Sequence, residues 1–139
     1  MTDIQAAIGL VQLSRTDELL GNRRRVAEVY TPHLERHPLL KPPFVPVGLE
    51  PNWQSYQVTT RDAGVLTRNE IMERLFKAGV PTRRGVMASH LELPYCGIGV
   101  SLPHTECVAA NSLQLPIHSA LTENEVGRVI AAIDGLVQH

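Results

Sequence analysis

The chain has 139 residues with 13 basic and 14 acidic side chains, a net charge of −1 and 43% hydrophobic residues, which describe one ordinary globular domain. Balanced charge without one long basic patch argues against a nucleic-acid-binding protein, and no apolar run approaches the roughly 20 residues of a membrane span. The first residues lack the charged-then-apolar layout of a signal peptide, so we expect a cytoplasmic protein whose cysteines, Cys96 and Cys107, stay reduced.

Three segments share a helix-start pattern, in which a threonine is followed three residues later by glutamine or glutamate. The threonine hydroxyl caps the new helix and the second side chain bonds back to the threonine, an arrangement called a capping box. The pairs are Thr2 with Gln5, Thr67 with Glu70, and Thr122 with Glu125. They predict helices that begin near residues 3, 68 and 123.

The first predicted helix runs from about residue 3 to about residue 34 and carries two apolar stripes at helical spacing. A helix that only covers a sheet needs one stripe, so two stripes predict contacts on two sides. Only one side can belong to this chain, and we expect the second stripe to pair with another copy in a homodimer. The first stripe comprises Ile4, Ile8, Val11, Leu19, Val26 and Tyr30, and the second Ala6, Leu10, Leu13, Leu20 and Ala27.

After this helix, the pattern predicts a small sheet of about three strands covered by helices in β-α-β-α-β-α order, an α/β fold of the α+β sandwich type. A proline-rich stretch at 37–51 is expected to be irregular. We expect the second helix to bury Ile71, Met72, Leu75 and Phe76, and the closing helix to bury Val126, Val129, Ile130, Ile133 and Val137. The predicted strands are 53–60, 80–84 and 113–117, and the later helices are 68–78, 104–111 and 123–137.

The predicted loop at 85–102 is a candidate functional segment, because a loop of this length inside a compact domain is more often functional than idle. Arg83 and Arg84 precede this loop, and their guanidinium groups suit a carboxylate or a phosphate. Solvated charges at a strand end are the alternative interpretation of both arginines.

Two further clusters are interpreted as structural. His90, Cys96, His104 and Cys107 are the residue types of a zinc site, but their spacing matches no closed Cys/His pattern. We therefore expect buried thiols and surface histidines. The three arginines at 23–25 are interpreted as a solvated helix flank with acidic neighbours, because successive helix positions point in different directions.

Four segments in chain order resemble the DegT/StrS-type pyridoxal-phosphate-dependent nucleotide-sugar aminotransferases of fold type I. Residues 52–58 resemble the family's Ser-Trp-His-x-Tyr-x-Val strand, with Gln54 in place of the usual histidine. Residues 79–95 resemble its substrate-facing loop, although the proline is shifted by one position and Arg84 stands near where many members carry another histidine. The other two segments are 1–13, with the pattern Met-x-x-Ile-x-Ala-Ala-Ile-Gly-x-x-Gln-Leu, and 115–126, with the pattern Leu-Pro-x-x-x-x-Leu-Thr-x-x-x-Val.

The resemblance implies that the chain is the C-terminal small domain of such an enzyme, with residues 1–36 as a helix linking to a missing large domain and 37–139 as the small domain. Pyridoxal phosphate would be the cofactor of the full-length family, held as a Schiff base by a lysine upstream of Met1. Neither Lys41 nor Lys77 occupies a family cofactor position. We therefore expect this chain to hold no cofactor or metal and no catalytic residue.

By the same resemblance, Arg84, His90 and Tyr95 are the candidate substrate-binding residues, facing a sugar nucleotide. The parent enzyme would move an amino group from an amino-acid donor to a keto-sugar nucleotide. A non-catalytic truncated module for oligomerisation or sugar-nucleotide binding remains the alternative.

Overall fold

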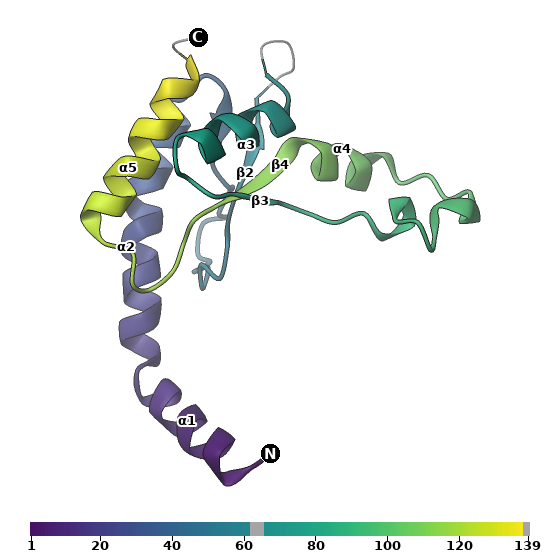
Figure 1. Ribbon diagram of the computed structural model, residues 1–139. Coiled ribbons are helices and arrows are strands. Elements are labelled where there is room, and N and C mark those ends of the chain that lie inside the picture. Colours follow the sequence, from purple (N-terminus) through teal and green to yellow (C-terminus); the bar gives the residue numbers. More distant parts are fainter. Residues whose placement is uncertain (62–65, 138–139) are drawn as a thin grey trace.

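The computed structural model describes residues 1–61 and 66–137, and within them helices pack against one small antiparallel sheet (Figure 1). This confirms the predicted mixed α/β fold. The helices are α1 (Asp3–Ser14), α2 (Thr16–Glu35), α3 (Arg68–Lys77), α4 (Pro103–Asn111) and α5 (Glu123–Asp134). The strands are β1 (Leu40–Lys41), β2 (Tyr56–Thr60), β3 (Arg83–Arg84) and β4 (Ser112–Leu115), and short 3-10 turns are η1 (Ser89–Leu91), η2 (Cys96–Ile98) and η3 (Gly135–Val137).

The sheet has the order β1-β2-β4-β3, and every pairing in the described chain is antiparallel. It therefore holds one strand more than the three expected, because β1 lies inside the proline-rich stretch that we expected to be irregular. Two residues are too few to show a period of two. The strand expected from residue 53 begins only at Tyr56, since Trp53 adopts a left-handed backbone with φ of 51°. Pro81 and Pro116 lack the amide hydrogen that would extend β3 and β4.

The long N-terminal helix expected up to residue 34 is two helices, broken at Arg15. The hydroxyl of Ser14 donates to the Val11 carbonyl at 2.9 Å, and the hydroxyl of Thr16 donates to the Leu13 carbonyl at 2.8 Å. Such local bonds compete with the helical ladder and bend it. From the N-terminal end of α2, α1 continues at an angle and projects away from the body of the molecule (Figure 1).

Both apolar stripes enter the core in α2, where Val26, Ala27, Tyr30 and Leu34 are buried. The structure describes all residues of α1, and none of their side chains is buried. The expectation that one stripe would find cover along the whole helix is therefore wrong for α1. The exposed apolar side chains there are Ile4, Ile8, Leu10, Val11 and Leu13.

Two side chains expected in the core lie outside it. Phe76 is 73% exposed on the flank of α3, and Val137 is 51% exposed. The closing helix ends at Asp134 and continues as the tighter turn η3, which places Leu136 in the core in place of Val137.

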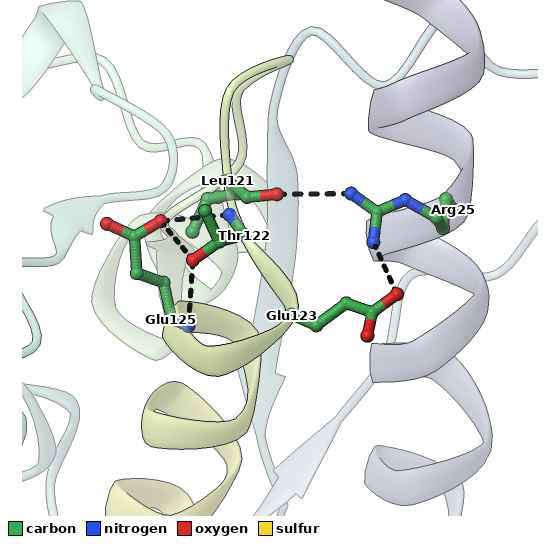
Figure 2. Close-up of polar contacts among 5 residues, drawn as sticks. All are labelled: Arg25, Leu121, Thr122, Glu123 and Glu125. Carbon is green, nitrogen blue, oxygen red and sulfur yellow. Dashed lines mark hydrogen bonds and ion pairs between the residues drawn. The ribbon is translucent and has the colours of Figure 1, made fainter.

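The three predicted capping boxes are present at α1, α3 and α5. At α5, Figure 2 shows the Glu125 carboxylate accepting hydrogen bonds from both the backbone and the hydroxyl of Thr122. In the same view, the Arg25 guanidinium of α2 donates to the Leu121 carbonyl at 3.1 Å and faces Glu123 at 3.6 Å. Arg25 is therefore a structural link between α2 and α5, and not the solvated flank that we expected.

Two side chains, Arg61 and His37, organise the chain where α2 ends. Arg61 donates through its guanidinium to the carbonyls of Glu35, His37 and Leu40 at 2.8 to 3.0 Å. The buried His37 accepts at Nδ1 from the amides of Leu39 and Leu40, and its Nε2 faces the Ile133 carbonyl at 3.2 Å. The ring is therefore neutral with the proton on Nε2, and it joins the chain just after α2 to β1 and α5.

Candidate functional site

Strand β3 places its two arginines beside different cavities, as expected for neighbouring residues of a strand, which point to opposite faces. Arg83 lines a cavity of about 370 Å³ together with Gln54 and His118. Arg84 lines a second cavity of about 320 Å³, whose wall also includes Arg68 of α3. The rest of this second wall comes from the segment after β3 and from α4, and its polar members are Glu92 and Glu106.

A close approach between Gly85 and Ser112 fixes the end of β3. The Gly85 amide donates to the Ser112 carbonyl at 3.1 Å, and the Val86 amide donates to the Ser112 hydroxyl at 3.3 Å. A Cβ at Gly85 would lie 2.6 Å from the Cβ of Ser112 and would overlap its hydroxyl. Glycine is therefore required here for β3 to reach β4, and this contact sets the position of Arg84.

Beyond Gly85, residues 86–102 form an arm that projects from the sheet and returns to it through α4 (Figure 1). His90 ties the arm to α4, because its Nε2 lies 3.0 Å from Glu106 Oε1 and its side chain is only 10% exposed. The same carboxylate oxygen accepts the Leu102 amide at 2.8 Å. The hydrogen bonds from the Leu102 amide and then from His90 lower the pKa of Glu106. Leu102 is the N-cap residue of α4 and has no side-chain group that could cap the helix, so the Glu106 carboxylate takes that role.

The structure places the three predicted substrate-binding residues in different settings. Arg84 is exposed and lines the second cavity. His90 is not among the described residues that line this cavity, but it is hydrogen-bonded to Glu106, which is. Tyr95 is 52% exposed on the arm and does not line the described wall of the cavity. A common ligand for these three side chains stays a prediction.

Arg68 is a site residue that sequence reasoning missed. It is the first residue of α3 and is only 9% exposed, although this position at a helix start usually faces solvent. Its Nη1 donates to the Ser112 carbonyl at 3.4 Å. Apolar periodicity carries no signal for such a buried cation, because its contact with Ser112 of β4 joins segments that are distant in sequence.

The described residues do not form a pyridoxal phosphate site by themselves. Lys41 is exposed on the edge strand β1, and Lys77 is 71% exposed on α3 with its Nζ 2.7 Å from Glu73. A Schiff-base lysine needs a partly desolvated pocket, and both of these side chains are exposed.

Within residues 1–61 and 66–137, no group of three histidine, cysteine or acidic side chains is arranged to hold a metal ion. Cys107 is an exposed free thiol, so the expectation that it is buried is wrong. The side chain of Cys96 lies outside the described part of the chain, and its predicted reduced state is untested. No described helix is long and apolar enough to cross a membrane.

Residues 1–134 match the DegT/DnrJ/EryC1/StrS aminotransferase family, and the chain belongs to this family. It is 36% identical over 137 residues to GDP-perosamine synthase from Caulobacter vibrioides, a match that covers 96% of this chain and 37% of that protein. The crystal structure of the aminotransferase TlmJ from Streptoalloteichus hindustanus superposes with a TM-score of 0.89 at 34% identity, covering 99% of this chain and 37% of TlmJ.

The structure of Spr1654 from Streptococcus pneumoniae, solved in a PLP form, matches with a TM-score of 0.89 at 27% identity. The match covers 99% of this chain and 36% of the Spr1654 chain. The chain therefore spans little more than a third of the length of these relatives. Pyridoxal phosphate is the cofactor of the full-length family.

Proposed function

We propose that this chain is the C-terminal part of a pyridoxal-phosphate-dependent aminotransferase acting on a keto-sugar nucleotide with an amino-acid donor. The amino group of the donor would replace the keto oxygen of the sugar, and the donor would leave as a keto acid. The cofactor and its lysine would belong to the rest of the protein. This chain would supply a substrate wall from Arg84, His90 and Tyr95, and it would be inactive by itself.

The observation that carries this proposal is the uncovered helix α1. Ile4 is 74%, Leu10 68% and Leu13 71% exposed on a helix without buried residues among those described. An apolar surface of this kind marks a contact with another protein surface. The chain matches its relatives over about a third of their length, so the remaining two thirds of such an enzyme is the partner that fits best.

A second candidate function is a non-catalytic module for oligomerisation or sugar-nucleotide binding. It is favoured by the core, whose buried side chains on α2, α3, α5 and the sheet pack on one another without α1. In this case α1 would pair with α1 of a second copy in a dimer. Localisation in the cytoplasm is part of both proposals.

The coding sequence upstream of Met1 distinguishes the two candidates. An in-frame large domain with a lysine in its cofactor motif would support the enzyme. A stop codon and a promoter directly before Met1 would contradict it and support the module.

Reductive labelling tests the expected inactivity of the chain. The purified protein would be mixed with pyridoxal phosphate and reduced with borohydride, and the lysines would be mapped by mass spectrometry. We expect no stoichiometric label on Lys41 or Lys77, because both side chains are exposed to solvent and neither lies in a desolvated cofactor pocket of the described chain. Robust labelling of either lysine with transaminase turnover would overturn this expectation. Lys77→Arg would serve as the control for adventitious labelling.

A further inference from the structure

Arg68 carries a buried charge with incomplete hydrogen bonding. It is 9% exposed, and its Nε has no hydrogen-bond partner within residues 1–61 and 66–137. Its Nη1 bond to the Ser112 carbonyl is long, at 3.4 Å. A buried charged donor without a partner costs free energy. Such a group in a cavity wall is therefore positioned for a ligand that would complete its bonds.

Arg84 adds a second positive charge to the same cavity. Burial lowers the pKa of the Arg68 guanidinium, and the nearby charge of Arg84 lowers it further. Among the ion pairs of the described residues, none involves Arg68 or Arg84. Glu106 is already engaged by the Leu102 amide and by His90. The two guanidinium groups therefore share one cavity, and within the described residues neither forms an ion pair with a carboxylate.

We propose that the cavity between α3, β3 and the arm binds a small oxyanion, a phosphate or carboxylate group, on Arg68 and Arg84. Guanidinium groups bind these anions with paired, charge-assisted hydrogen bonds. The volume of about 320 Å³ is that of a small-molecule site. Glu92 and Glu106 line the wall that the arm and α4 contribute. The charged end of the ligand therefore belongs at the arginines, and hydrogen-bond donors of the ligand belong at the carboxylates.

This inference deepens the proposed function, because it names the chemical group that the Arg84 wall would bind and adds Arg68 to that wall. Its test needs no enzyme activity. Inorganic phosphate would be titrated at constant ionic strength into the ¹⁵N-labelled chain, with glutamate as the carboxylate probe and chloride as the control anion. Backbone amide shifts near Gly85 and Val86 would report the cavity.

Arg84→Gln and Arg68→Met remove one guanidinium each, and Arg83→Gln is the matched control on the opposite face of β3. We expect saturable binding by the wild type and by Arg83→Gln, and Kd values at least about tenfold higher for the other two variants. Thermal melts would verify folding. If Arg68→Met unfolds, the exposed Arg84→Gln decides the matter.

Equal responses in all four proteins, loss of binding in Arg83→Gln, or shifts reproduced by chloride would overturn the site. The same holds if neither phosphate nor glutamate saturates. Saturation by phosphate or by glutamate, or by both, identifies which oxyanion the site accepts. A failure here would leave the aminotransferase proposal intact, because the upstream coding sequence tests that proposal independently.

Discussion

The Arg25 guanidinium donates to the backbone carbonyl of Leu121 at 3.1 Å, joining residues 96 positions apart in sequence. This bond lies where the chain enters α5, directly before the Thr122 cap, so it orients α5 against α2 (Figure 2). The Glu123 carboxylate, at 3.6 Å, adds a weaker attraction because its side chain is 90% exposed.

Replacing Arg25 should therefore destabilise the protein. Arg25→Met keeps the aliphatic stem and leaves the Leu121 carbonyl without this donor, so we expect a loss of about 1 kcal/mol in the free energy of unfolding. Urea denaturation would measure it. Arg24→Met is the matched control, because the ion pair that the described residues give Arg24 is with the exposed Glu50, at 3.4 Å, and its loss should change the stability little. Equal losses in both variants would show that the Leu121 bond contributes nothing specific.

Gly85→Ala should destabilise the edge of the sheet. Its new methyl group would overlap the side chain of Ser112 and push β3 from β4, at a cost of about 1 to 3 kcal/mol. Gly127→Ala on α5 is the control, since its methyl group meets nothing within 4 Å and should stabilise the helix by up to about 1 kcal/mol. The Tm values of the two variants should move in opposite directions, and a Gly85→Ala variant as stable as the wild type would contradict a role for the Ser112 contact in holding β3 to β4.

The stability of the protein should fall in mild acid because of His37. Burial lowers the pKa of its imidazole below the ordinary value of 6.5, although the Ile133 carbonyl and Asp134 favour the charged form. The unfolded chain therefore binds the proton at higher pH than the folded chain does. This contribution to stability is complete above about pH 6.5 and is lost as the pH falls toward the lower folded-state pKa.

His37→Asn isolates this effect, because the Asn oxygen can replace Nδ1 as the acceptor for the amides of Leu39 and Leu40. Chemical denaturation between pH 5 and about pH 7.5 would compare the two proteins. The variant should show a smaller decline in the free energy of unfolding over this interval than the wild type. Identical pH profiles would rule out His37 as a source of the acid sensitivity.

Self-association through α1 follows from its exposed apolar residues. Burial of apolar surface contributes roughly 25 cal/mol per Å², so the helix should pair with a second copy at high micromolar concentration. Leu10→Asp combined with Leu13→Asp should give a monomer in size-exclusion chromatography with light scattering. Phe76→Asp removes an equally exposed side chain, 73% exposed on α3, and should leave the dimer intact. A monomeric wild type, or a double variant that remains dimeric, would contradict pairing through α1.

The sequence by itself determined where three helices begin. Each capping box joins residues only three positions apart, so its geometry depends on local chain conformation and on no distant contact. The order of elements from β2 to α5 was predictable for a similar reason, because apolar periodicity reports which face of a segment is buried. The resemblance that led to the family also rested on short local motifs.

Only the tertiary structure decided which surfaces remain uncovered and which polar groups meet. Whether Phe76 is buried depends on what packs on its flank of α3, and periodicity cannot show that. The bonds of Arg25 to Leu121 and of His90 to Glu106 join elements brought together by the fold. The burial of Arg68 beside Arg84 likewise depends on the contact between the first residue of α3 and Ser112 of β4. Contacts between distant segments have no periodic signature in the chain, so the candidate oxyanion site could be found only in the folded protein.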